Sequence, residues 1–232
     1  WKLPFVTTLM AKGYLPDDHP LNAGVIGRAR WTDVRLFTDQ ADLVLGVGYD
    51  VIEINYEEWI RSGVNVASVD YRMVDADESV LVRSEAVGDL KTSIQFLSGL
   101  TPVDNDWKEA EIIEHRSRFE RNLRPIGYGF APHEAIDVLQ KEFPDDGLMV
   151  YDVGGHLHQL ASQWIARNPL SALSTNGWSS MGYAIPAALA AKLSQPERPV
   201  MAILGDGCFQ MTVGEMATAK RLGLSIPFIV RN

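Results

Sequence analysis

The sequence predicts an α/β fold with two Rossmann-like units, each built around a mainly parallel sheet. Three observations support this prediction. Short apolar runs recur along the chain, several of them end in glycine or aspartate, and segments of helix length separate them. This alternation is typical of βαβ units, in which a helix connects each strand to the next parallel strand.

The first unit is predicted over residues 1–103. Its strands are expected in the apolar runs at residues 3–9, 43–47 and 64–70. We interpret the run at 43–47 as the core of a buried strand, because glycine and a polar turn follow it. A loop is expected at 13–20 and a closing helix at 90–97. The segment 98–106, SGLTPVDND, is predicted to be the domain boundary.

A charged helical connector is predicted over residues 104–128. The stretch 106–124 has the densest charge in the chain, and it mixes both signs. Opposite charges four residues apart stabilise a helix on its exposed face. Two pairs have this spacing, Glu114 with Arg118 and Glu120 with Arg124. We therefore expect a solvated helix between the two units.

The second unit is predicted over residues 129–232 as a run of βαβ segments. A helix is expected at 132–147, where it ends in a Pro/Asp/Gly loop. A strand follows at 148–154 and opens onto glycines and His156. The small residues of 180–193 predict a helix that packs closely on the sheet. A strand, a helix and a strand are expected in PVMAILGDG, TVGEMATAKRLGL and IPFIVRN.

The composition excludes several classes of function. The chain has 232 residues, 46% of them hydrophobic, which suits one or two globular domains with apolar cores. Its formal net charge of −9 argues against nucleic acid or an anionic membrane as a partner. No apolar run approaches the roughly 20 residues of a membrane span. The single cysteine gives no disulfide framework and favours a reducing, cytoplasmic location.

The first residues, WKLPFVTTLMAKG, lack the features of a signal peptide, and they predict a core strand. The sequence does not begin with Met. We therefore expect the chain to be a piece of a longer protein.

A polar residue follows each of the last two apolar runs. Asp206 lies between Gly205 and Gly207, and Asn232 closes the segment IPFIVRN. Ligands of open α/β sheets bind beyond the carboxyl ends of the strands, and neighbouring strand ends lie about 5 Å apart. If these strands are neighbours, both side chains can ligate one Mg²⁺, and the glycines let the backbone approach a diphosphate. The segment lacks the Lys of a GxxxxGK[ST] phosphate loop, so the metal ion is expected to supply the positive charge.

Two structural interpretations compete with this one. A plain Asp-Gly turn between strand and helix remains the alternative for GDG. For Glu215 we favour a structural role over a catalytic role, because TVGE over residues 212–215 matches a capping box. In that motif a Glu at the third helical position accepts a hydrogen bond from the residue at the helix start.

Three ordered motifs resemble the thiamine diphosphate-dependent enzymes. The segment from GDG to Asn232 is similar to their GDG…NN signature. NGWSSMGYAIPAALAAKL resembles the segment that packs against the thiazolium and pyrimidine rings, and YDVGGHLHQLASQW resembles the strand and loop that meet the diphosphate. The first unit, with PFVTTLMAKGYLPDDHPLNAGVIG and ADLVLGVGYDVIEINYEEW, resembles the middle domain of acetolactate synthases, and GYDVIE resembles the catabolic kind. The resemblance covers nearly the whole chain.

The resemblance implies roles for individual residues. Met181 matches the bulky apolar residue that props thiamine diphosphate into its bent form. Ser179 matches the position whose backbone carbonyl accepts from the cofactor's 4′-amino group. Contacts with the cofactor are implied for His156, Gly155, Gly205, Gly207, Cys208 and Phe209, and metal ligation for Asp206 and Asn232. Asn232 matches the first Asn of NN, and the second would stand at the next position.

Alternatives for these residues stay open. Met181 could be a core Met at a helix start, and His156 could be a capping or solvent-exposed His. For Cys208 we expect the backbone amide to matter more than the thiol, and we see no case for a reactive thiol.

The implied activity is that of an acetolactate synthase, which decarboxylates pyruvate and joins the two-carbon unit to a second 2-oxo acid. The implied cofactors are thiamine diphosphate and Mg²⁺, while FAD in the middle domain and the identity of the acceptor stay open. The full-length protein is expected to be a homodimer or homotetramer. Its activating Glu is expected outside this chain, so the chain alone is expected to be inactive.

Three other functions remain as alternatives. Another thiamine diphosphate-dependent decarboxylase or carboligase would share the same motifs. A non-catalytic homologue would keep the fold and the cofactor but not the chemistry. A nicotinamide dehydrogenase is disfavoured, because GVGYD offers only a lone GxG.

Overall fold

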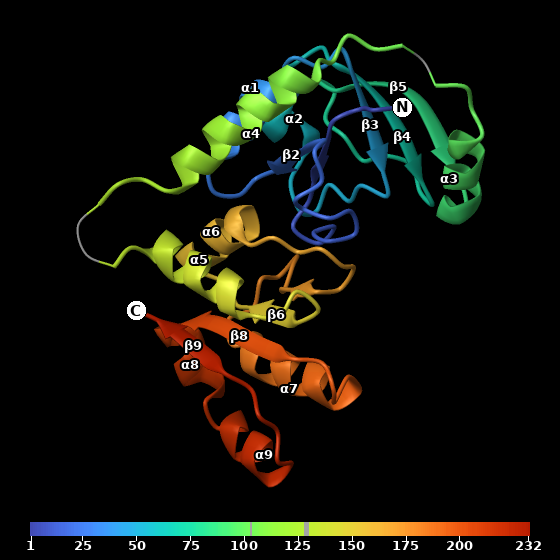
Figure 1. The fold of residues 1–232 in the computed structure, drawn as a ribbon. Coiled ribbons are helices and arrows are strands. Elements are labelled where there is room, and N and C mark those ends of the chain that lie inside the picture. Colours follow the sequence, from blue (N-terminus) through green and yellow to red (C-terminus); the bar gives the residue numbers. More distant parts are fainter. Residues whose placement is uncertain (103, 128–129) are drawn as a thin grey trace.

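The computed structural model describes residues 1–102, 104–127 and 130–232. Within them, the predicted α/β fold with parallel sheets is confirmed (Figure 1). Residues 103, 128 and 129, at the predicted unit boundaries, lie outside this description. In the described part of the chain, no helix is long and apolar enough to cross a membrane.

The first unit contains two small parallel sheets. β1 (Phe5–Thr7) pairs with β2 (Asn22–Val25), and β4 (Asn65–Asp70) lies between β3 (Leu43–Val47) and β5 (Leu81–Val87). The helices are α1 (Trp31–Thr38), α2 (Tyr56–Trp59) and α3 (Leu90–Ser98). Asp89 caps α3, since its carboxylate accepts a hydrogen bond of 2.8 Å from the Thr92 N–H. The three predicted strands and the closing helix are thereby confirmed.

β3 is not the buried strand that its apolar sequence predicts. Leu43, Leu45 and Val47 are 53%, 39% and 45% exposed. The core of the unit lies on the other side, where Tyr56 and Trp59 of α2 pack with other buried apolar side chains. An apolar run therefore located the strand correctly, but it could not reveal whether a second layer covers its outer face.

α4 (Glu109–Leu123) packs on the first unit, so the predicted helix is confirmed but only its outer face is solvated. Four side chains on its inner face are buried, namely Ile112, His115, Phe119 and Leu123. Their helical spacing makes one stripe that packs against α1 and β2 (Figure 1). Among the described residues, neither predicted i,i+4 ion pair forms. Arg118 lies beside His115, and Arg124 pairs with Asp137.

The second unit is a four-stranded parallel sheet with helices on both faces (Figure 1). The strands, in the order β7-β6-β8-β9, are β7 (Ala172–Leu173), β6 (Leu148–Tyr151), β8 (Val200–Gly205) and β9 (Phe228–Arg231). The helices are α5 (Pro132–Glu142), α6 (Gly155–Gln163), α7 (Ala184–Ser194), α8 (Asp206–Thr212) and α9 (Glu215–Arg221).

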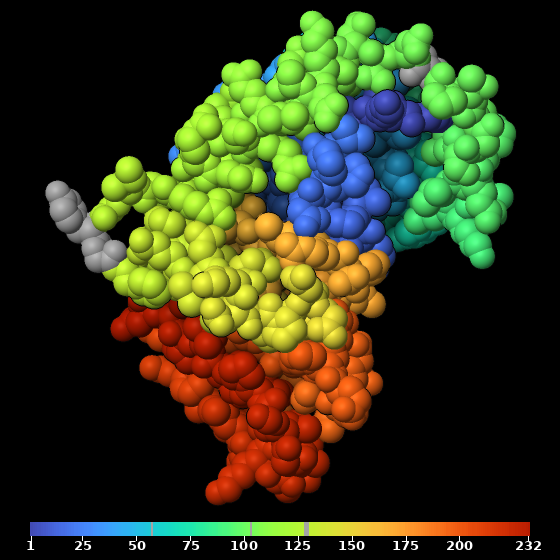
Figure 2. Space-filling model, viewed as in Figure 1, coloured from blue at the N-terminus to red at the C-terminus, as the bar shows by residue number. Residues whose placement is uncertain are grey.

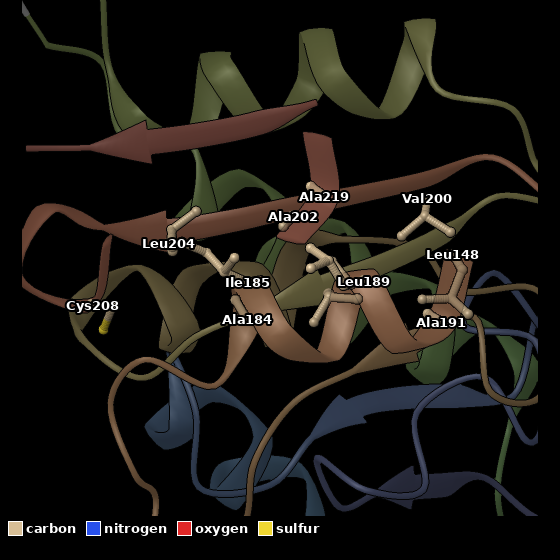
Figure 3. Close-up of a cluster of buried hydrophobic side chains, with 12 residues drawn as sticks. Leu148, Ala184, Ile185, Leu189, Ala191, Val200, Ala202, Leu204, Cys208 and Ala219 are labelled. Atoms are coloured by element: carbon tan, nitrogen blue, oxygen red, sulfur yellow. The ribbon is translucent and has the colours of Figure 1, made fainter. Parts of the chain in front are cut away.

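Side chains alternate between the two faces of this sheet along β6 and β8. One set faces α7 and comprises Leu148, Val150, Val200, Ala202 and Leu204. Figure 3 labels Leu148, Val200, Ala202 and Leu204 of this set beside Ala184, Ile185 and Leu189 of α7, with Cys208 at the end where Leu204 lies. The other set packs with α5 and α6 and comprises Met149, Tyr151, Met201 and Ile203. The sheet is buried on both faces, which explains why its strands are apolar at consecutive positions.

The two units touch through backbone and charged groups. The Asp17 N–H donates to the Ala166 carbonyl at 2.9 Å. The Asp17 carboxylate accepts from the Ala166 N–H at 2.8 Å and from the Lys12 ammonium at 2.5 Å. The Ser162 hydroxyl donates to the Ala29 carbonyl at 2.9 Å. In Figure 2 the N-terminal residues (blue) lie directly against the segment that follows β6 (amber to orange).

Two helices of the second unit differ from their predicted bounds. The segment 180–193 is helical only from Ala184 onward. The helix expected in TVGEMATAKRLGL, residues 212–224, is found as α9, and a separate helix, α8, precedes it. Thr212 therefore ends α8 instead of capping a helix, and its hydroxyl donates to the Gly182 carbonyl at 3.1 Å. The capping box predicted between Thr212 and Glu215 is wrong, because Glu215 is the first residue of α9.

Candidate functional site

The sheet of the second unit has one point at which its connections diverge. The chain leaves β6 through α6 toward β7, and it leaves β8 through α8 and α9 toward β9 on the opposite side. The carboxyl ends of β6 and β8 are therefore the topological switch point of the sheet. Ligands of open α/β sheets bind outside the carboxyl ends of the strands at such a point.

Asp152, the residue after β6, organises this end of the sheet. Its side chain is fully buried. Its carboxylate accepts hydrogen bonds from the backbone N–H groups of Val153 (2.9 Å), Gly182 (3.2 Å) and Ala184 (2.8 Å). The carboxylate thus joins the end of β6 to the segment before α7. Sequence reasoning missed Asp152, although Asp152, like Asp206, directly follows an apolar strand.

His156 lies in the first turn of α6, two residues after Gly154, which has φ +135°. Its side chain is 9% exposed, so the solvent-exposed alternative is wrong. A β-carbon on Gly205 would stand 3.4 Å from the imidazole Cε1 atom, which places His156 against the end of β8. Burial, with the nearby Arg231 charge, lowers the pKa of His156. The buried Nε2 atom has no hydrogen-bond partner, so it remains available to a ligand.

Asp206 and Asn232 lie at the same edge of the sheet. β8 and β9 are neighbours, and their last paired residues are Gly205 and Arg231. Asp206 and Asn232 each follow directly along the chain, and both are exposed. Asp206 begins α8, so it does not belong to a plain turn. Among the described residues there is no cluster of three or more His, Cys, Asp or Glu side chains that could hold a metal ion. Metal ligation by Asp206 and Asn232 therefore remains a prediction.

Met181 lies next to the glycine that follows Asp206. Its terminal methyl carbon is 3.2 Å from the point where a β-carbon on Gly207 would stand. The side chain is 49% exposed and α7 begins only at Ala184, so Met181 is not a core residue at a helix start. Ser179, two residues earlier, has φ +47°, a left-handed conformation that is costly for a residue other than glycine. Its carbonyl direction is therefore set by an unusual backbone geometry.

The remaining predicted residues form the wall of this region. Cys208 is buried, and its thiol donates to the Val153 carbonyl at 3.3 Å, which ties α8 to the end of β6. Burial raises the pKa of this thiol, consistent with the prediction that it is not a reactive group. Phe209 packs against the core shown in Figure 3, and the exposed Gly155 begins α6.

The site residues therefore come from three separate segments that meet at the switch point. The His156 ring lies against Gly205, and the Met181 side chain lies against Gly207. The Cys208 thiol forms a hydrogen bond with the segment after β6. The geometry brings together the motifs that sequence reasoning selected.

Comparison with known proteins identifies the family to which each unit belongs. The profile of the thiamine pyrophosphate enzyme central domain matches residues 1–97. The profile of the thiamine pyrophosphate enzyme C-terminal TPP binding domain matches residues 152–232, which include every site residue named above.

Several curated proteins are similar over essentially the whole chain. The acetolactate synthase large subunit of Lactococcus lactis is 27% identical, with 100% of this chain and 41% of that protein covered. The acetolactate synthase large subunit of Corynebacterium glutamicum is 31% identical, with 99% and 38% covered. The acetolactate synthase isozyme 1 large subunit of Escherichia coli is 29% identical, with 100% and 42% covered. The chain thus spans about two fifths of the length of these relatives. It belongs to the thiamine pyrophosphate enzyme family, with the family's central domain in its first unit and the cofactor-binding domain in its second.

Proposed function

We propose that the protein uses thiamine diphosphate and Mg²⁺ to decarboxylate pyruvate and to join the two-carbon unit to a second 2-oxo acid. The observation that carries this proposal is the meeting of His156, Met181 and the GDG segment at one switch point. The acetolactate synthases that resemble the whole chain favour this reaction over a simple decarboxylation.

The polar residues of the site fit a metal-bound diphosphate. The Asp206 carboxylate and the Asn232 amide are oxygen ligands of the kind that Mg²⁺ prefers. The unpartnered Nε2 atom of His156 can donate a hydrogen bond to a phosphate oxygen. Gly205 and Gly207 carry no side chains, so the backbone at the end of β8 can approach the diphosphate closely.

The segment before α7 supports the rings of the cofactor. Thiamine diphosphate, when bound, supplies the electron sink for decarboxylation of a 2-oxo acid. Met181 presents an apolar side chain on which the bent cofactor can rest, and its half-exposed position leaves that side chain accessible. The Ser179 carbonyl is assigned the role of acceptor for the 4′-amino group. The Asp152 carboxylate holds this segment against the end of β6 through its hydrogen bonds with the Gly182 and Ala184 N–H groups.

The test has two stages, binding and product analysis. Calorimetry on the full-length protein should detect thiamine diphosphate binding that depends on Mg²⁺, and the purified full-length protein should then form acetolactate from pyruvate. Release of acetaldehyde as the main product would favour a simple decarboxylase. Cofactor binding without turnover of any 2-oxo acid would favour the non-catalytic homologue. Absence of cofactor binding would refute the proposal.

A further inference from the structure

Arg231 stands at the end of β9, opposite Gly205 at the end of β8. Directly paired residues of neighbouring strands point to the same face of a sheet. The face in question carries Ile229 and Ile203 and packs against α5 and α6, the side from which His156 approaches. Gly205 has no side chain, and the space that its β-carbon would fill is bordered by the His156 ring. Arg231 and His156 therefore flank the same gap at the end of β8.

Both side chains have a buried polar atom that lacks a partner. These atoms are Nε2 of His156 and Nη1 of Arg231. The side chain of His156 is more than nine-tenths buried. Within the described chain, Arg231 takes part in no ion pair. A partly buried guanidinium without an anion is unfavourable, because desolvation of a charge needs compensation by a partner.

The electrostatics of the pair agree with this geometry. His156 is buried and Arg231 is partly buried, so water solvates neither group fully. A negative charge between the two groups would therefore stabilise both. An anion with several oxygens could accept hydrogen bonds from both.

We propose that Arg231 and His156 together bind the diphosphate, so that Arg231 supplies positive charge in addition to the metal ion. This inference rests on the proposed function. It differs from the expectation that the metal ion supplies the positive charge at the diphosphate, which followed from the absence of a phosphate-loop Lys. The guanidinium offers a planar pair of N–H donors, which suits a phosphate better than a Lys ammonium would.

The inference predicts that part of the diphosphate affinity is independent of metal. Inorganic pyrophosphate is titrated in EDTA into the wild-type protein and into Arg231→Leu, Arg231→Gln and His156→Gln. Arg221→Leu is the matched control, because it removes the same charge from the exposed end of α9. Loss of a charge-assisted hydrogen bond should weaken pyrophosphate binding by about tenfold to a hundredfold in both Arg231 variants. The control should retain wild-type affinity.

A second titration uses thiamine diphosphate with saturating Mg²⁺, and a third uses thiamine, which lacks phosphate. Arg231→Leu should weaken the binding of thiamine diphosphate but not that of thiamine. Thermal melting and circular dichroism verify the fold. If Arg231→Leu does not fold, Arg231→Gln carries the test, since its amide can still form hydrogen bonds in a partly buried position.

The outcomes separate this inference from the proposed function. The inference is overturned if the wild type and the folded Arg231 variants bind pyrophosphate with equal affinity. It is also overturned if the wild-type protein does not bind pyrophosphate in the absence of metal. Thiamine diphosphate binding would in either case leave the proposed function standing. Conversely, Arg231-dependent binding of pyrophosphate with no binding of thiamine diphosphate supports the anion site and overturns the proposed function.

Discussion

The buried carboxylate of Asp152 accepts a hydrogen bond of 2.8 Å from the backbone N–H of Ala184, the first residue of α7. A second bond, from the Gly182 N–H at 3.2 Å, reaches the same side chain. One residue thus connects the end of β6 to the segment that carries Met181. The position of Met181 over the end of β8 depends on this connection.

Asp152→Ala should therefore lower both stability and cofactor affinity. The change leaves buried N–H groups at Gly182 and Ala184 without an acceptor, and such a loss costs about 3 kcal/mol or more. Denaturant unfolding measures the free energy of unfolding, and calorimetry measures the affinity for thiamine diphosphate. Asp152→Asn should be intermediate, because its single amide oxygen can accept only part of these bonds.

Asp75→Ala is the control, since it removes an exposed carboxylate from the first unit. It should change neither quantity. A stability loss in Asp152→Ala with unchanged cofactor affinity would show that Asp152 supports the fold but does not position the Met181 segment.

Three of the four strands of the second unit, β6, β8 and β9, could be predicted from sequence, and β6 and β8 are buried on both faces. The two-residue strand β7 was not predicted. The apolar runs that contain β6, β8 and β9 are continuous, and all three matched. β5 was missed because its outer positions are exposed and its sequence, LVRSEAV, mixes apolar with charged residues. The burial of one face of α4 was also missed. Its apolar stripe is present in the sequence, but the density of charge around it favoured a solvated helix.

The candidate site was predictable where a motif ties several residues together. His156, Met181 and Asp206 were selected from motifs, and the fold brings their segments to one end of the sheet. Arg231 and Asp152 could not be assigned in this way. Their importance depends on partners that are distant in sequence, namely His156 for Arg231 and Ala184 for Asp152.

The contact between the units contains a buried ion pair that a mutation can test. Lys12 and the Asp17 side chain are 2% and 7% exposed, and their charged atoms lie 2.5 Å apart. Lys12→Met leaves the Asp17 charge without its cation, so the free energy of unfolding should fall by roughly 3–5 kcal/mol. Lys12→Met combined with Asp17→Asn should be less destabilising than Lys12→Met alone. Equal stability of wild type and Lys12→Met in denaturant unfolding would refute this assignment.

His115 predicts a dependence of stability on pH. It is buried in α4, its Nε2 atom lies 2.8 Å from the Ala23 carbonyl oxygen, and burial lowers its pKa. As pH falls through the ordinary His value near 6.5, the unfolded chain binds a proton that the folded chain does not bind. The free energy of unfolding should therefore fall with decreasing pH in this window and be fully retained above it.

His115→Gln keeps a hydrogen-bond donor for Ala23 but removes the titrating group. The slope of stability against pH between 7.5 and 5.5 should be smaller in this variant than in wild type. Some slope should remain, because burial also lowers the pKa values of His156 and His158. An unchanged slope would show that His115 does not contribute to the pH dependence.

The contact between Met181 and Gly207 can be tested by a double-mutant cycle. Gly207→Ala places a methyl group 3.2 Å from the Met181 terminal carbon, so Met181 must shift. Because a small misplacement of a supporting group disturbs the reacting geometry, turnover should fall by about tenfold to a hundredfold. Met181→Ala should also reduce turnover more than it weakens cofactor binding.

The double variant should be little worse than Met181→Ala, because the displaced side chain is then absent. Steady-state kinetics on pyruvate and calorimetry with thiamine diphosphate, both with the full-length protein, provide the two readouts. Additive losses in the double variant would mean that Gly207→Ala acts through the backbone and not through Met181.

Asp206 provides the test of the metal site, because it is exposed and begins α8 directly after β8. If it ligates Mg²⁺, Asp206→Ala removes an anionic oxygen ligand that faces the diphosphate. The affinity for thiamine diphosphate at fixed Mg²⁺ should then fall by roughly tenfold or more, and excess Mg²⁺ should restore it only in part. Asp206→Asn keeps an oxygen but loses the charge, so its effect should be intermediate.

A structural role for Asp206 predicts a different pattern. Asp206 lies in the first turn of α8, where the loss of its charge costs at most about 1 kcal/mol, so Asp206→Asn would then be close to neutral. Asp206→Ala would lower the melting temperature without altering the Mg²⁺ dependence. Titrations of thiamine diphosphate at several Mg²⁺ concentrations separate the two cases, with Glu215→Ala as the control for loss of a carboxylate from the following helix. Because Arg231 is proposed to hold the diphosphate independently of metal, Asp206→Ala should keep the metal-free affinity for pyrophosphate. A wild-type Mg²⁺ dependence in Asp206→Ala would therefore exclude Asp206 as a metal ligand while leaving the Arg231 site intact.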